Sequence, residues 1–238
     1  MEIADTVAII TGASSGIGLA TARLFAKRGA HVALVARSAE RVQQLATALP
    51  HALAAPTDMR DTTAVCQMIA QVQQHYGRID ILINNAGQGM HVPVAEADLD
   101  QYRDVFELNV VSVLNAMQAV VPIMRAQPGG GVIINISSGL SRRIVPGVGP
   151  YASTKYALNA LTLTARMELA PENIRVGLML PGITATDFAR NAIRMTTGQT
   201  ERHRTLPADT PEHVAEKIIE AVETEAAEVY ADSIRPSA

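Results

Sequence analysis

Thr6-Val-Ala-Ile-Ile-Thr11-Gly-Ala-Ser-Ser-Gly-Ile-Gly18 is the stretch that decides the fold. The apolar run from Thr6 to Thr11 predicts a strand that is buried on both faces. Glycines follow at a G-x-x-x-G-x-G spacing, and glycine permits a tight turn and a close approach of the backbone to phosphate. A helix is predicted from Ile17, so its free N–H groups would point at a pyrophosphate. The alternative is a glycine-rich turn that holds no ligand.

Strands and helices alternate along the rest of the chain. Further strands are predicted at 31–36, 51–55, 80–84, 131–137, 173–180 and 228–231, and helices at 17–28, 39–49, 62–76, 98–124, 151–169 and 210–223. Continuous apolar strands are typical of a parallel sheet covered on both faces. Because crossovers are right-handed, the pattern predicts an α/β fold with a single doubly wound, Rossmann-like parallel sheet and helices on both faces. No linker divides the sequence, so we expect one dinucleotide-binding and catalytic domain over 1–238.

Composition narrows the classes of partner. The net charge is −3 with both signs interspersed, which argues against nucleic acid or a membrane surface as the main partner. The longest apolar run, 109–124, is too short and polar to span a bilayer. Cys66 is the sole cysteine, which is typical of a reducing compartment, and we expect it to be a small core residue. The segment 1–6 lacks the basic region of a secretory signal, so we expect a cytoplasmic location.

Candidate ligand-binding groups follow the predicted strands. In a doubly wound sheet, ligands bind beyond the carboxyl ends of the strands. The groups at these ends are Gly12 to Gly18, Arg37, Asp58, Asn85, Ser138 and Gly182. We therefore expect them to form one site.

Tyr151-Ala-Ser-Thr-Lys155 lies in a predicted helix, which places Tyr151 and Lys155 one turn apart on the same face. A free tyrosine has a pKa of about 10 and is a poor base at neutral pH. A neighbouring ammonium favours the phenolate, so we expect a lowered pKa of Tyr151. The pair could then exchange a proton with a carbonyl or alcohol oxygen. The alternative is a pair on the helix surface, because this spacing also occurs by chance.

The end of the second predicted strand bears on the choice of cofactor. An acidic residue that clamps the ribose is usual there, but this chain has Ala36, Arg37 and Ser38. A guanidinium in place of a carboxylate favours a 2′-phosphate. We therefore predict NADP(H) rather than NAD(H), the alternative for Arg37 being a solvated charge.

These residues together resemble the short-chain dehydrogenase/reductase family, of the conventional type, over nearly the whole chain. The motifs that carry the resemblance occur in family order: Thr11 to Gly18, Asn84-Asn-Ala-Gly87, Asn109, Ile136-Ser-Ser138, Tyr151 to Lys155, and Pro181-Gly-Ile-Thr-Ala-Thr186.

The resemblance implies a catalytic role for four residues. Tyr151 would be the acid in reduction and the base in oxidation. Lys155 would lower the pKa of Tyr151 and bond the nicotinamide ribose. Ser138 would orient the substrate oxygen, and Asn109 would hold a water that links Lys155 to solvent. For Asn109 and Ser138 the alternatives are a polar group satisfied by backbone and an ordinary turn serine.

The resemblance also implies a set of cofactor-binding residues. Asp58 and the backbone of Met59 would meet the adenine, Ile183 would bond the carboxamide through its backbone, and Thr186 would bond the phosphates or the carboxamide. The whole set is Gly12, Ser14, Ser15, Gly16, Ile17, Gly18, Arg37, Ser38, Asp58, Met59, Asn85, Ala86, Gly87, Tyr151, Lys155, Pro181, Gly182, Ile183 and Thr186. Asn84 looks structural.

The function expected from these observations is an NADP(H)-dependent oxidoreductase that interconverts a ketone and a secondary alcohol. The alternative is a non-catalytic dinucleotide-binding regulator on the same fold. An epimerase or dehydratase would be expected to have a longer substrate domain. No histidine cluster has metal-ligand spacing, so we expect no catalytic metal.

Several regions bear on the substrate and the assembly. A substrate lid is expected around 182–207, with an apolar face from Phe188, Ile193 and Met195. Arg142 or Arg143 would meet an acidic substrate group or be solvated, and His91 would touch substrate or be a loop residue. The helix 151–169 has apolar residues on more than one face, which is expected either within its own domain or beneath a second subunit. We expect a homo-oligomer, a dimer or a tetramer, and the chain lacks the glycine-rich end typical of the tetramers.

Overall fold

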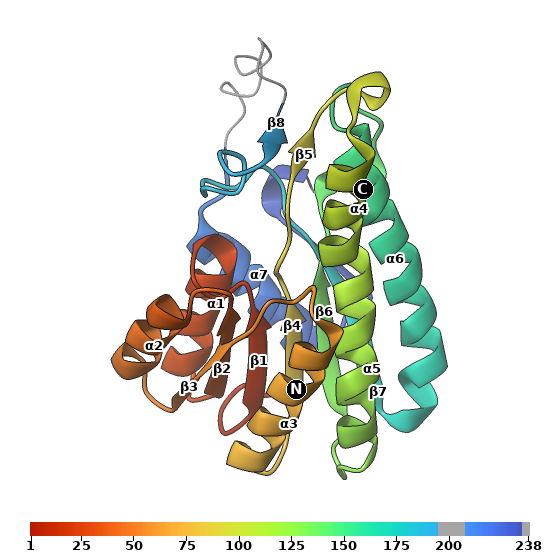
Figure 1. Cartoon of the computed structure of the whole chain (residues 1–238). Coiled ribbons are helices and arrows are strands. Elements are labelled where there is room, and N and C mark those ends of the chain that lie inside the picture. Colours follow the sequence, from red (N-terminus) through yellow and green to blue (C-terminus); the bar gives the residue numbers. More distant parts are fainter. Residues whose placement is uncertain (195–207, 235–238) are drawn as a thin grey trace.

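Seven apolar runs form one parallel sheet in the computed structural model, which describes residues 1–194 and 208–234 (Figure 1). The strands are β1 (Val7–Thr11), β2 (His31–Ala36), β3 (Ala52–Pro56), β4 (Ile81–Asn84), β6 (Gly131–Ile136), β7 (Ile174–Leu180) and β9 (Glu228–Tyr230). Their order across the sheet is β3-β2-β1-β4-β6-β7-β9, and every pair is parallel. The predicted doubly wound sheet is confirmed. Its strand order turns back between β1 and β4, where such sheets bind ligands.

Two helical layers cover the sheet and form two cores. On one face lie α1 (Gly16–Lys27), α2 (Ala39–Ala48) and α7 (Pro211–Thr224), and on the other lie α3 (Thr62–Tyr76), α5 (Ser112–Arg125) and α6 (Gly149–Leu169). Side chains alternate between the faces, so Ile10 packs in the first core and Ile9 in the second. Helix ends follow local chemistry. Asp61, for example, caps α3 by accepting a 3.0 Å bond from Ala64 N, and Gly77 ends α3 at φ +78°.

The predicted helix 98–124 is not one regular α-helix. It consists of α4 (Leu99–Phe106), a π-helical turn (Glu107–Val111) and α5. The π turn is centred on Asn109, whose side chain bonds groups outside the helix. Single π turns inside α-helices occur often at functional sites. Apolar periodicity does not detect such a turn, because it changes the register by only one residue.

The structure contains a second, two-stranded parallel sheet that the sequence analysis did not predict. It pairs β5 (Met90–His91) with β8 (Ile193–Arg194) and lies above the main sheet in Figure 1. Gln88 Nε2 reinforces it with a 2.7 Å bond to Asn191 O. The chain after β4 is therefore tied to the 182–194 segment. The remainder of the expected lid, 195–207 with Met195, lies outside the described residues.

Two further expectations concern α3 and the long helical stretch. Cys66 is exposed, so the expectation of a core cysteine is wrong. The core-facing positions of α3 are Val65, Met68, Ile69 and Val72, and Cys66 falls beyond their edge. By length and composition alone, Leu99–Arg125 is long and apolar enough to cross a membrane, and 44% of an apolar 18-residue stretch within it is buried in the protein. This is weak evidence, because the buried core helix of a globular protein has the same length and composition.

Candidate active site

The turn after β1 and the turn after β4 lie side by side because these strands pair. The N–H groups of Asn85 and Ala86 donate to Thr11 Oγ1 at 2.9 and 3.0 Å. Asn85 Nδ2 donates to Thr11 O at 2.9 Å. Asn85 therefore fixes the glycine turn through its side chain, while Gly87 follows it toward the centre of the site.

The glycine turn tolerates no side chain at its tightest point. Gly12 and Gly16 have φ values of +67° and +52°. A Cβ on Gly18 would lie 2.3 Å from Gly12 O, which is backbone and cannot move aside. Ser15, the N-cap of α1, makes no side-chain cap bond, so the first N–H groups of α1 are not capped by it. This turn, with Ser14 and Ile17 beside it, fits a dinucleotide pyrophosphate.

The residues predicted for the adenosine end follow β2 and β3. Arg37 is exposed, directly after the buried Ala36. Ser38 caps α2 by accepting a 3.4 Å bond from Arg41 N. Asp58 accepts a 3.0 Å bond from Arg60 N, and Met59 is buried. The end of β2 thus presents a guanidinium and no carboxylate of its own.

Tyr151 lies buried at the start of α6, with 5% of its surface exposed. Burial raises its pKa to about 12, and a hydrogen bond with the Ser138 side chain lowers it in part. Ser138 also accepts a 3.1 Å bond from Leu140 N, which orients its hydroxyl. The side chains of Tyr151 and Ser138, which are proposed to meet the substrate oxygen, therefore interact.

Lys155 does not lower the pKa of the tyrosine in this structure. Its Nζ donates to Ile136 O at 2.9 Å and lies 5.9 Å from the centroid of the Tyr151 ring. Burial lowers the pKa of Lys155 to about 8. The predicted direction for Tyr151 is wrong, because the cost of burying a phenolate exceeds the effect of an ammonium at this distance.

Asn109 joins three parts of the site. Its Oδ1 accepts from Gln88 N at 2.9 Å, and its Nδ2 donates to Gln88 O and Thr154 Oγ1, both at 3.0 Å. A Cβ on Gly87 would lie 3.1 Å from Asn109 Oδ1 and 3.8 Å from Lys155 Nζ. Asn109, Lys155 and Gly87 are therefore neighbours.

A buried polar network that the sequence reading missed supports Ser138. Asn159 accepts from Ser137 Oγ at 2.5 Å and donates to Ser141 Oγ at 2.9 Å. Ser141 Oγ donates in turn to Ser138 O at 2.6 Å. The sequence spacing could have predicted this position, because Asn159 lies four residues after Lys155 on the same helix face.

The 182–194 segment covers the site from above. The Phe188 ring lies 5.9 Å from the Tyr151 ring, tilted by 58°. A Cβ on Gly16 would lie 3.1 Å from Thr186 Cγ2, so this segment also contacts the glycine turn. Ile183 O accepts from Asp209 N at 2.8 Å.

The residues from β9 onward pack against the base of this segment. A Cβ on Gly182 would lie 2.0 Å from Ser233 Oγ, and one on Gly139 would lie 2.9 Å from Ile234 Cδ1. Pro181 O accepts from Gly139 N at 2.9 Å, which joins the turns after β6 and β7.

The remaining candidates take different positions. Arg142 forms an ion pair with Glu228 on β9, and Arg143 is exposed. His91 is half-buried on β5. In residues 1–194 and 208–234, no group of three His, Cys, Asp or Glu side chains could hold a metal ion.

Comparison with known proteins agrees with this fold. Residues 6–197 match the short chain dehydrogenase family. A 3alpha-hydroxysteroid dehydrogenase of Mediterraneibacter gnavus is 38% identical over 194 residues, which cover 79% of this chain and 77% of that one. The chain belongs to the short-chain dehydrogenase family.

Two solved structures extend the comparison to the cofactor. A short chain dehydrogenase from Burkholderia cenocepacia in complex with NADP has a TM-score of 0.83 at 30% identity, covering 98% of this chain and 91% of the other. A 3-ketoacyl-(acyl-carrier-protein) reductase from Brucella melitensis complexed with NADH has a TM-score of 0.88 at 26% identity, covering 97% and 98%. These neighbours support a nicotinamide dinucleotide cofactor without distinguishing the two forms.

Proposed function

We propose that this oxidoreductase interconverts a ketone and a secondary alcohol with NADP(H), using Tyr151 as acid and base. The observation that carries the proposal is the interaction of the buried Tyr151 side chain with Ser138, at the ends of the strands. The nicotinamide would supply or accept the hydride. The protein positions the substrate oxygen and moves its proton.

The raised pKa assigns the proton to Tyr151 at neutral pH. A phenol with a pKa of about 12 is protonated there, which suits donation to a carbonyl oxygen during reduction. Ser138, oriented by Leu140 N, donates a second hydrogen bond to that oxygen. Lys155 and Asn109 lie behind the tyrosine beside Gly87, which suits a path for replacing the proton.

The preference for NADP(H) rests on the end of β2. The exposed Arg37 follows Ala36 and has no carboxylate next to it in sequence, so it can meet a 2′-phosphate. The glycine turn, Asn85 to Gly87 and Pro181 to Thr186 would hold the remainder of the dinucleotide.

An apolar substrate is favoured by the surroundings of Tyr151. Met90, Val92 and Val105 are buried with it, and Leu140 and Ile193 pack against this group. Among the described residues, the 182–194 segment would cover the bound substrate, and its Phe188 ring lies next to the Tyr151 ring. The relative named as a 3alpha-hydroxysteroid dehydrogenase suggests including cyclic, steroid-like ketones among the substrates tested.

A homo-oligomer is proposed from the outer face of α6. Tyr156 and Met167 on this helix are 41% and 79% exposed, as expected if a second subunit covers them.

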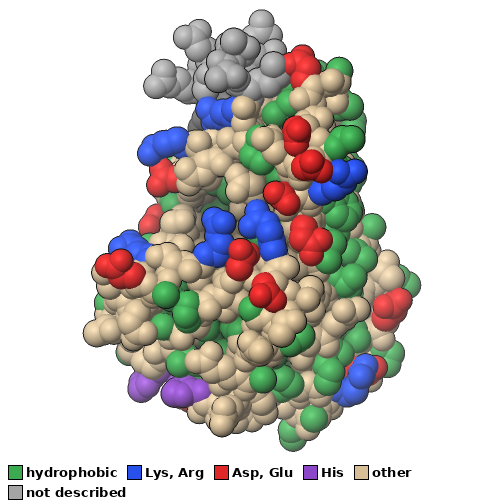
Figure 2. Space-filling model, viewed as in Figure 1, with side chains coloured by type: hydrophobic (Ala, Val, Ile, Leu, Met, Phe, Trp, Pro, Cys, Tyr) green, Lys and Arg blue, Asp and Glu red, His purple; other side chains and the backbone are tan. Residues whose placement is uncertain are grey.

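Charges of both signs are interspersed on the face shown in Figure 2, which supports a small molecule rather than nucleic acid as the partner.

The test is oxidation of NADPH and NADH by the purified protein against ketones, β-ketoesters and cyclic diketones. The proposal expects ketone-dependent turnover with NADPH preferred. Tight dinucleotide binding without turnover of any compound in the panel would count against an enzymatic function and favour a non-catalytic dinucleotide-binding regulator.

A further inference from the structure

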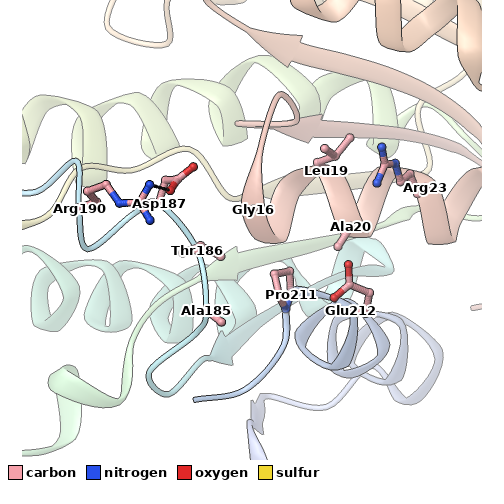
Figure 3. A pocket seen from close by; sticks show the side chains of 10 residues that line it. All are labelled: Gly16, Leu19, Ala20, Arg23, Ala185, Thr186, Asp187, Arg190, Pro211 and Glu212. Carbon is pink, nitrogen blue, oxygen red and sulfur yellow. Dashed lines mark ion pairs between the residues drawn. The ribbon is translucent and has the colours of Figure 1, made fainter. Parts of the chain in front are cut away.

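Arg190 lines a cavity beside the glycine turn. This cavity of about 510 Å³ lies between the start of α1, residues 185–190 and the start of α7 (Figure 3). Its charged lining residues are Arg23, Asp187, Arg190 and Glu212. Arg190 comes from the segment that covers the site, and Arg23 comes from α1.

Contacts on both sides fix the turn that carries Arg190. On one side, the Thr186 methyl group lies against Gly16. On the other, Asn191 N donates to Asp187 O at 2.8 Å, and Asn191 O accepts from Gln88 Nε2 at 2.7 Å. The backbone that carries Arg190 is therefore fixed beside the turn that is proposed to bind the pyrophosphate.

The present partner of Arg190 is easily exchanged. Its Nη1 lies 2.8 Å from Asp187 Oδ1, and the two side chains are 82% and 58% exposed. An exposed ion pair of this kind contributes little to stability, because water screens it. A pyrophosphate offers more negative charge and accepts paired hydrogen bonds from a guanidinium.

We propose that Arg190 binds the pyrophosphate of the dinucleotide from above, exchanging Asp187 for the phosphate oxygens. The proposal rests on the proposed dinucleotide site. Because NADPH and NADH share the pyrophosphate, Arg190 strengthens the binding of both. Arg37, in contrast, would act on NADPH alone.

Arg23 provides a matched control. It lines the same cavity, but it lies two turns along α1 from Gly16, about 10 Å along the helix axis. Arg23→Gln and Arg190→Gln remove the same charge from the same cavity. A general change in electrostatic potential would affect both variants alike, whereas direct contact affects Arg190 alone.

The experiment is calorimetric titration of the wild-type protein, Arg190→Gln, Arg190→Lys, Arg23→Gln and Asp187→Asn with NADPH and with NADH. We expect Arg190→Gln to weaken the binding of both dinucleotides by about five- to twentyfold, and Arg190→Lys to restore part of it. Asp187→Asn should tighten both by about two- to fivefold, because the competing carboxylate is gone.

Three results would overturn the proposal: unchanged binding in Arg190→Gln, an equal loss in Arg23→Gln, or a loss confined to NADPH. A wild-type protein that binds neither dinucleotide would instead overturn the proposed dinucleotide site, and the role of Arg190 with it. Titration reads binding without turnover, so a missing substrate does not obscure the outcome.

Discussion

Asn109 Nδ2 donates a 3.0 Å hydrogen bond to Thr154 Oγ1, and this bond fastens the π-helical turn to the helix that carries Tyr151 and Lys155. Both side chains are fully buried. Asn109 therefore sets the distance between two elements, as well as lying near Lys155.

Replacing Asn109 with alanine should lower the free energy of unfolding by about 2–4 kcal/mol, because the partly buried backbone N–H and C=O groups of Gln88 lose this partner and the buried Thr154 hydroxyl loses one of its two hydrogen bonds. Asn115→Ala is the control, since Asn115 on α5 makes one exposed bond to Thr62 O. Urea denaturation of both variants measures the difference. Equal losses of unfolding free energy in the two variants would show that the Asn109 hydrogen bonds contribute no more to stability than the exposed bond of Asn115.

Tyr151→Phe should reduce turnover by about 10²- to 10⁴-fold and leave dinucleotide affinity nearly unchanged, because only the acid–base hydroxyl is removed. Tyr156→Phe makes the same chemical change on the same helix at a side chain that is 41% exposed, and it should retain activity. Steady-state rates and dinucleotide titrations of both variants test this. Near wild-type turnover in Tyr151→Phe would remove it from the acid–base role.

Lys155 should make the free energy of unfolding depend on pH in the alkaline range. Its pKa is about 8 in the folded protein and 10.5 ordinarily, so between these values the unfolded chain binds more protons and stability rises with pH. The difference corresponds to about 3 kcal/mol. Lys155→Met avoids this cost but loses the bond to Ile136 O, so we expect it to be about 2 kcal/mol more stable than wild type at pH 7.

That advantage should shrink as pH rises from 8 toward 10. Denaturation of both proteins across this range measures it, with Lys27→Met, at an exposed position of α1, as the control. A stability difference that does not vary with pH would contradict the lowered pKa.

Arg37→Asp should shift the cofactor preference from NADPH toward NADH by about tenfold or more, because a carboxylate repels a 2′-phosphate and accepts bonds from a 2′-hydroxyl. Arg143→Asp, at another exposed arginine, should leave the ratio unchanged. The ratio of the two dissociation constants is the measurement. An unchanged ratio in Arg37→Asp excludes Arg37 from the phosphate site.

Gly18→Ala should cost about 2–3 kcal/mol of stability and weaken dinucleotide binding, because the new Cβ would lie 2.3 Å from a backbone oxygen. Gly129→Ala is the control, since a Cβ there meets nothing within 4 Å, and its effect should stay within about 0.5 kcal/mol. Thermal unfolding and NADPH titration compare the two. If both are tolerated, the tightness of the turn does not limit its sequence.

The strands and helices were predictable because buried parallel strands are continuously apolar and their helices have a different period. The convergence of Gly12, Asn85 and Ser138 followed from the direction of the strands. The π turn at Asn109 and the pairing of β5 with β8 depend on bonds between distant residues. The pKa of Tyr151 could not be read from the Tyr151–Lys155 spacing, because burial determines its direction.

The contacts of Ser233 and Ile234 with Gly182 and Gly139 can form only late in the synthesis of the chain. A chain grows from its amino end, so the glycine turn, Tyr151 and Lys155 all leave the ribosome before these two residues. The turns after β6 and β7 therefore gain the contacts with Ser233 and Ile234 last. A nascent chain halted before β9 would already contain the turn proposed to bind the dinucleotide, while the floor beneath Gly182 and Gly139 would still be missing.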